Sequence, residues 1–140
     1  TGLRDLKFIL VKPQTMMNSS GFAVAKLARF YKVKPENVWV IHDDIDLPLG
    51  RLKIRLGGGS AGHQCIKSSI KQLGTDQFVR FRLGIGHPGP GSSEDKVVSY
   101  VLSEFRHKEK TEVKKIIKKT AKAIQFALDN SLKEAANRFR

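Results

Sequence analysis

Histidine and carboxylate side chains are concentrated where the apolar run Val38–Ile41 ends: His42 is followed by Asp43, Asp44 and Asp46. Clustered carboxylates suit a hard cation, histidine suits a transition metal, and a carboxylate can instead orient a catalytic histidine. A hydrogen-bonded surface turn is the third interpretation. Because α/β proteins place ligand sites at the carboxyl ends of strands, we favour an orienting carboxylate over a turn, and a turn over a metal site.

A glycine-rich loop, Gly57–Gly62, lies shortly after this cluster and leads into His63 and Gln64. Glycines allow the backbone to approach an anion, and the amino end of a following helix adds a favourable dipole. The loop lacks the Gly-Lys-Ser/Thr ending of a P-loop. With Arg55 before it, the loop predicts a phosphate-binding segment. Beside it, Cys65 is interpreted as a small buried residue rather than a nucleophile.

The charge balance favours a polyanionic partner. The 140 residues contain 26 Lys and Arg against 13 Asp and Glu, a net charge of +13. Nucleic acid is the first candidate partner and an anionic membrane surface the second. Lysine-rich helix faces are often merely solvated, but five lysines within residues 114–122, with few carboxylates, favour contact with an RNA backbone. The single Cys65 excludes an internal disulfide and indicates a reducing compartment.

The elements that position these residues follow from apolar periodicity, which predicts one α/β domain over residues 1–140. The expected strands are Leu6–Val11, Val38–Ile41, Arg51–Leu56 and Phe78–Ile85. Arg80 and Arg82 are expected on an exposed face, opposite Val79, Phe81 and Leu83. The expected helices are one capped by Asn18 or Ser19 and ending near Tyr31, one from the glycine loop to Gly74, one over Lys108–Leu128, and one over Leu132–Phe139.

Four blocks together resemble the bacterial-type peptidyl-tRNA hydrolase family: residues 12–21, 42–50, 56–63 and 80–89. The resemblance covers nearly the whole chain. It implies a mixed central sheet flanked by helices, with the N-terminal part of the family fold absent. It also implies hydrolysis of the ester between a peptide and tRNA, with no metal, no cofactor and no membrane partner. The partner implied is tRNA, and the family is generally monomeric.

The resemblance also implies roles for individual residues. Asp43 corresponds to the aspartate that holds the catalytic histidine, and Asn18 to the amide near the reacting carbonyl. The remaining counterparts are Met17 as a wall of the cleft, His63 with Gln64 as cleft residues, and Arg55 with Arg82 as a clamp on a tRNA phosphate. This set is chemically coherent, since an ester needs a general base and an oxyanion donor and tRNA needs fixed cations.

Two departures from the family pattern lead to an alternative function. The family's first strand and its catalytic-histidine block have no counterpart here, and His42, His63, His87 and His107 fall elsewhere in the pattern. We therefore expect the 140 residues alone to be inactive. Gln64 and Cys65 also stand where the family has asparagine and glycine. The alternative is a non-catalytic, RNA-binding or ribosome-associated relative. A bacterial cytoplasmic or mitochondrial location fits, and the charge slightly favours the organelle.

Overall fold

The structure is a computed structural model that describes residues 6–140. Contacts divide the chain into two compact units. The first unit contains Ile41–Ile54 and Phe81–Arg140, and the second contains residues 6–40 and 55–80 of the described chain. The prediction of a single domain over residues 1–140 stays a prediction, and the chain's opening, residues 1–5, lies outside the described residues.

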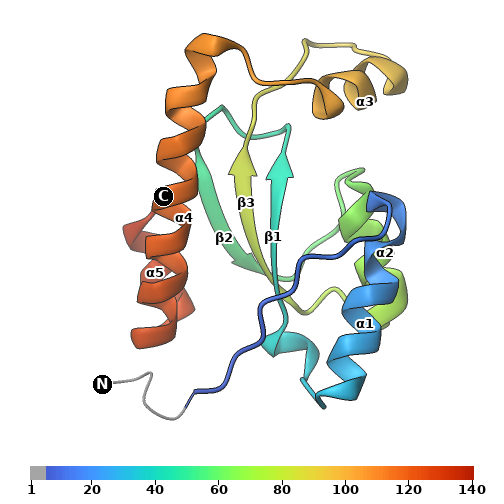
Figure 1. Ribbon diagram of the computed structural model, residues 1–140, viewed down its shortest axis with the longest axis vertical. Coiled ribbons are helices and arrows are strands. Elements are labelled where there is room, and N and C mark those ends of the chain that lie inside the picture. The colour runs from blue at the N-terminus through green and yellow to red at the C-terminus, as the bar shows by residue number, and fades with distance from the viewer. Residues whose placement is uncertain (1–5) are drawn as a thin grey trace. The chain divides into compact units, whose positions relative to one another are not determined.

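The described strands form a three-stranded sheet with the order β1-β3-β2 (Figure 1). The strands are β1 (Trp39–Asp44), β2 (Leu52–Leu56) and β3 (Val79–Gly84). Val79 N–H donates to Val38 O and Ile85 N–H to Asp44 O, so β3 runs parallel to β1. Gly57 N–H donates to Phe78 O and Gly84 N–H to Arg51 O, so β3 runs antiparallel to β2. The mixed α/β fold predicted from the sequence is confirmed.

The central position of β3 explains why its burial differs from the prediction. Val79, Arg80 and Phe81 are all buried, so the expected exposure of Arg80 is wrong. A central strand is covered on both faces, which overrides the simple alternation of a half-exposed strand. The edge strand β2 does alternate as predicted over Leu52 to Arg55, although Leu56 is exposed.

The second unit contains η1 (Met17–Ser19), α1 (Ser20–Phe30), η2 (Pro35–Asn37) and α2 (Gln64–Leu73). Helix α1 lies along α2 (Figure 1). Their close approach depends on Gly21, whose N–H donates to Ser68 Oγ at 3.0 Å. A Cβ on Gly21 would lie 2.1 Å from Ser68 O, so this helix contact requires glycine.

Two predictions for the second unit are wrong. Leu6–Val11 forms no strand, and its large apolar side chains are exposed. A strand requires the backbone groups of a partner strand, and the described sheet pairs only β1, β3 and β2. The predicted side-chain cap of α1 is also absent, because Ser19 Oγ donates to Asn18 Oδ1 instead of accepting a helix N–H.

The first unit contains α3 (Glu94–Leu102), η3 (His107–Glu109), α4 (Lys110–Asp129) and α5 (Leu132–Arg138). Ser93 and Ser131 cap α3 and α5 through their side-chain oxygens. Helix α4 buries Ile116, Ala123 and Ala127 and packs against α5 (Figure 1). Ile117, the apolar residue next to Ile116, is 56 % exposed. Within residues 6–140, no helix combines the length and hydrophobicity needed to cross a membrane.

Candidate functional site

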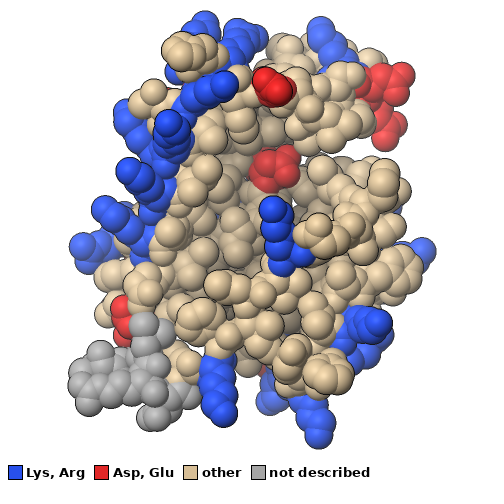
Figure 2. Space-filling model, viewed as in Figure 1, with Lys and Arg blue, Asp and Glu red and all other residues tan. Residues whose placement is uncertain are grey.

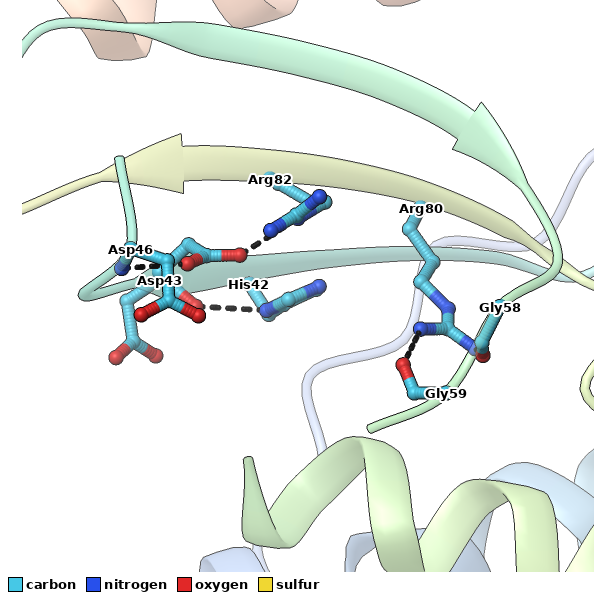
Figure 3. Close-up of polar contacts among 8 residues, drawn as sticks. His42, Asp43, Asp46, Gly58, Gly59, Arg80 and Arg82 are labelled. Carbon is cyan, nitrogen blue, oxygen red and sulfur yellow. Dashed lines mark hydrogen bonds and ion pairs between the residues drawn. The ribbon is translucent and has the colours of Figure 1, made fainter. Parts of the chain in front are cut away.

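The acidic turn after β1 is anchored through Asp44. Asp44 Oδ2 accepts a hydrogen bond from Arg82 Nε at 2.6 Å, and Asp44 Oδ1 accepts the N–H of Asp46 at 2.8 Å (Figure 3). Only 7 % of the Asp44 side chain and 14 % of the Arg82 side chain are exposed. The partners meet because β1 and β3 are neighbours. Asp44 therefore supports the interpretation of this stretch as a hydrogen-bonded turn.

His42 and Asp43 lie half-buried on the last part of β1. His42 Nδ1 lies 2.7 Å from the backbone oxygen of Asp43 (Figure 3). A carbonyl oxygen only accepts, so Nδ1 donates to it in the tautomer that carries the proton on Nδ1. The described chain, residues 6–140, contains no group of three or more His, Cys, Asp or Glu side chains placed to hold a metal ion.

The backbone around this turn is held to the end of β3. Ile85 N–H donates to Asp44 O at 3.1 Å, and Gly86 N–H donates to Leu47 O at 3.0 Å. Gly84 fits closely under the turn, because a Cβ there would lie 2.0 Å from Pro48 O. The carboxyl end of β1, which carries Asp43, is thus attached to regular structure rather than to a free loop. Such rigid attachment is what precise positioning of a site residue requires.

The glycine loop is organised around Arg80, a buried residue that sequence reasoning missed. Its Nη1 donates to Gly59 O at 2.5 Å and its Nη2 donates to Gly58 O (Figure 3). The guanidinium also lies over the Phe78 ring, 4.9 Å from the centroid. A strand expected to lie between two others would have indicated this burial.

The opposite side of the loop backbone is also bonded within the chain. Gly57 N–H donates to Phe78 O at 3.1 Å, and Gly58 N–H donates to Asp76 Oδ2 at 3.3 Å. The pKa of Asp76 lies below its ordinary value of 3.8, chiefly because the Gln77 side chain hydrogen-bonds to it, with smaller contributions from Gly58 N–H and the Arg80 charge. Gly57 and Gly58 are therefore not the predicted phosphate cradle, since their N–H groups are engaged.

Arg55 does lie at this loop, as the sequence predicts. A Cβ on Gly58 would come 2.5 Å from Arg55 Nη2, so the guanidinium folds across that glycine. Arg55 is exposed, whereas Arg80 beneath the loop is buried. At this loop, Arg55 is therefore the cation accessible to a ligand, whereas Arg80 is buried and hydrogen-bonds to the loop backbone.

The other predicted residues of the second unit lie on η1 and at the start of α2, which contact each other. Met17 is 38 % exposed, and Asn18 is exposed with its Oδ1 accepting from Ser19 Oγ at 3.3 Å. His63 precedes α2 in extended conformation, its N–H donating to Ser60 O at 2.9 Å. Gln64 is the first residue of α2 and is exposed. The roles assigned to these residues stay predictions.

An open pocket of about 530 Å³ lies in the first unit, among the segment after β3, α3 and η3. Its basic lining residues are His87, Lys96 and Arg106, and Glu109 is its acidic one. Tyr100 and Ile85 both line the pocket, and the Tyr100 hydroxyl donates a hydrogen bond to Ile85 O at 2.7 Å. This pocket was not predicted from the sequence, since it joins segments on both sides of the glycine- and proline-rich stretch at residues 86–93.

The fold and its polar turn define a mixed α/β protein whose candidate site lies at strand ends. The family model described as "Peptidyl-tRNA hydrolase" matches residues 2–140. The chain belongs to the peptidyl-tRNA hydrolase family.

Individual relatives agree with this assignment. The chain is 45 % identical over 126 residues to a protein of Neisseria meningitidis serogroup A named "Peptidyl-tRNA hydrolase", covering 90 % of this chain and 64 % of that protein. A protein of the same name from Moorella thermoacetica is 46 % identical over 134 residues, covering 95 % and 69 %. The crystal structure of peptidyl-tRNA hydrolase from Acinetobacter baumannii matches with a TM-score of 0.83 and 29 % identity, covering 91 % and 63 %. The chain thus spans less than two thirds of the Neisseria relative.

Proposed function

We propose that the protein hydrolyses the ester bond between a peptide and tRNA and so recycles tRNA. The family match over residues 2–140 carries this proposal. The mixed sheet and the polar turn after β1 are consistent with it, because they hold Asp43 at a strand end where α/β proteins bind ligands.

The proposed chemistry needs a general base and a donor to the developing oxyanion. Asp43 would orient a histidine that activates water, and the Asn18 amide would donate to the oxyanion. Met17 would form a wall of the peptide cleft, with His63 and Gln64 beside it. The four histidines of the chain belong to other blocks of the family pattern, so we assign the general base to none of them.

The proposed tRNA contact uses Arg55 and Arg82 as cations for one phosphate. Arg55 is exposed at the glycine loop. The contact with Asp44 engages Arg82 through Nε, and in this proposal its Nη groups face the phosphate. A fixed guanidinium suits this task, because bidentate contacts to phosphate depend on orientation. Replacing Arg55 with glutamine should raise KM for peptidyl-tRNA more than it lowers kcat.

The decisive experiment measures peptide release from peptidyl-tRNA by the protein expressed from its complete reading frame, with and without EDTA. Release that EDTA leaves unchanged is the expected result. Binding of tRNA without release would contradict the proposal and support the alternative, a non-catalytic RNA-binding or ribosome-associated relative. That alternative is motivated by Gln64, which stands where the family has asparagine. The Gln64→Asn variant, which restores the family's residue, is therefore assayed beside wild type.

We further infer that the protein acts as a monomer in a bacterial-type translation system, either in a bacterial cytoplasm or in a mitochondrion. The net charge of +13 favours a nucleic-acid partner. Sedimentation velocity should give one species with the mass of a single chain. Co-sedimentation with ribosomes at moderate salt tests whether the protein also binds the ribosome.

A further inference from the structure

Helix α4 carries a row of cations on its outer side, which we call the lysine surface. It consists of Lys110, Lys114, Lys115, Lys118, Lys119 and Lys122. All are exposed except Lys119, which is half-buried. Basic side chains follow the outer edge of α4 in the space-filling view (Figure 2). The opposite face of the helix is buried through Ile116, Thr120, Ala123 and Ala127.

The stability of the helix does not account for this arrangement. Lysines four residues apart, such as Lys110, Lys114, Lys118 and Lys122, are neighbours on a helix surface and repel one another. Helices favour cations near the carboxyl end, yet the last turn of α4 contains no basic residue. The lysines are thus placed against both electrostatic preferences of an isolated helix.

Carboxylates of the described chain neutralise little of this charge. Lys115 Nζ pairs with Glu112 Oε1 at 2.8 Å, and both side chains are largely exposed. Lys119 Nζ donates to Arg140 O at 2.8 Å. Within residues 6–140, Glu112 is the carboxylate paired with the lysine surface. An external polyanion would supply the missing counter-charge.

We propose that the lysine surface of α4 binds the phosphate backbone of RNA. Four helical residues rise about 6 Å, so Lys114, Lys118 and Lys122 form an extended row of point charges suited to successive phosphates. Lysine ammonium groups contact phosphates without reading bases, so the contact adds affinity rather than sequence preference. A membrane-surface helix instead buries an apolar face in lipid, and here that face is packed inside the protein.

The inference rests on the proposed function in taking RNA as the ligand, but it concerns a surface separate from the ester chemistry. It assigns to α4 a contact with the body of a tRNA-like double helix. Arg55 and Arg82 are assigned to the phosphate clamp instead. The two assignments are therefore separable by mutation.

The test compares two triple variants of the complete protein that lose the same charge. The first is Lys114→Gln, Lys118→Gln and Lys122→Gln, and the control is Lys7→Gln, Lys26→Gln and Lys34→Gln, all exposed positions outside α4. Binding to deacylated tRNA and to a short RNA duplex is measured between about 50 and 200 mM salt. The logarithm of the binding constant falls as the logarithm of the salt concentration rises, and each phosphate contact contributes about 0.9 to the steepness of that fall. The slope of the α4 variant should therefore be shallower than that of wild type by roughly 2.7. The slope of the control variant should stay near that of wild type.

Two results would overturn the inference. One is an equal loss of slope in both variants, which would assign the effect to net charge alone. The other is unchanged RNA binding by the α4 variant; if that variant also loses binding to phosphatidylserine-containing vesicles, the surface is assigned to a membrane instead. Circular dichroism should show both variants folded, since glutamine keeps high helix propensity.

Peptide release from peptidyl-tRNA separates this inference from the proposed function. Lysine-dependent RNA binding without release by wild-type protein supports the lysine surface and rejects the hydrolase proposal. Release by wild-type protein, with RNA binding unaffected in the α4 variant, supports the hydrolase proposal and rejects the lysine surface.

Discussion

Replacing Gly84 with alanine should release the acidic turn from the sheet. A Cβ at this position would lie 2.0 Å from Pro48 O, 2.8 Å from Leu47 O and 2.9 Å from Leu47 Cβ. Ordinary contact begins at 3.4 Å, so the Pro48 carbonyl must retreat by 1.4 Å. Two of the three close atoms belong to the backbone, so a change of rotamer does not relieve the clash.

The displacement has a cost that follows from the bonds it disturbs. Gly84 N–H donates to Arg51 O at 2.7 Å, and Gly84 O accepts from Gly50 N–H at 3.3 Å. Overpacking costs about 1–3 kcal/mol, and each weakened backbone hydrogen bond adds about 1 kcal/mol. We expect Gly84→Ala to lower the free energy of unfolding by about 3 kcal/mol, which lowers the urea midpoint by roughly 1–2 M.

Gly59→Ala is the matched control for equilibrium urea unfolding followed by circular dichroism. A Cβ at Gly59 meets no atom within 4 Å, and its φ lies outside the left-handed region. Its unfolding free energy should stay within about 0.5 kcal/mol of wild type. If Gly84→Ala unfolds at the same urea concentration as Gly59→Ala, the proposed close contact between Gly84 and the turn at Leu47 and Pro48 is refuted.

Three further predictions concern the polar contacts of the two units. Arg82→Met should cost about 3–5 kcal/mol in urea unfolding, because it leaves the buried Asp44 carboxylate unpaired; a loss no larger than that of the exposed Arg51→Met would contradict the role of this pair. Tyr100→Phe should cost about 1 kcal/mol by removing the hydroxyl that donates to Ile85 O, and a thermal midpoint identical to wild type would count against that bond. Because the pKa of Asp76 is lowered below 3.8, its contribution to stability should be fully present above that pH and be lost as the pH falls through the lowered pKa. The stability difference between wild type and Asp76→Asn should then close only in acid, and a difference that varies between pH 5 and 8 would contradict this assignment.

The sequence predicts those elements whose apolar pattern matches their burial. In β2, Leu52 and Ile54 are buried while Lys53 and Arg55 are exposed, as alternation requires. Helix α2 ends at Gly74, whose φ of 74° is the left-handed conformation that glycine favours at a helix end. These features are local, so residue type and spacing suffice to predict them.

The errors arise where tertiary context decides. Arg80 has the charge of an exposed strand residue, but the central position of β3 buries it and the loop carbonyls satisfy it. Leu6–Val11 has the composition of a strand, yet strand formation depends on a pairing partner elsewhere in the chain. Spacing also did not reveal that the N–H groups of Gly57 and Gly58 are engaged by Phe78 and Asp76.

Within the acidic cluster, the sequence did not distinguish the roles of the individual carboxylates. Asp44 pairs with Arg82, a residue 38 positions later in the chain. Only the neighbouring positions of β1 and β3 reveal this pair. The role proposed for Asp43 rests on the family pattern, and the pair between Asp44 and Arg82 does not test it.

The most direct test of the hydrolase proposal is kcat/KM for peptidyl-tRNA in the complete protein and its Asp43→Asn variant. An amide in place of the carboxylate retains the shape but no longer stabilises a protonated histidine. We predict that wild-type protein releases peptide and that the variant loses about 100-fold or more in kcat/KM, with unchanged affinity for deacylated tRNA. Wild-type protein that binds tRNA without releasing peptide, or a variant with full activity, would contradict it.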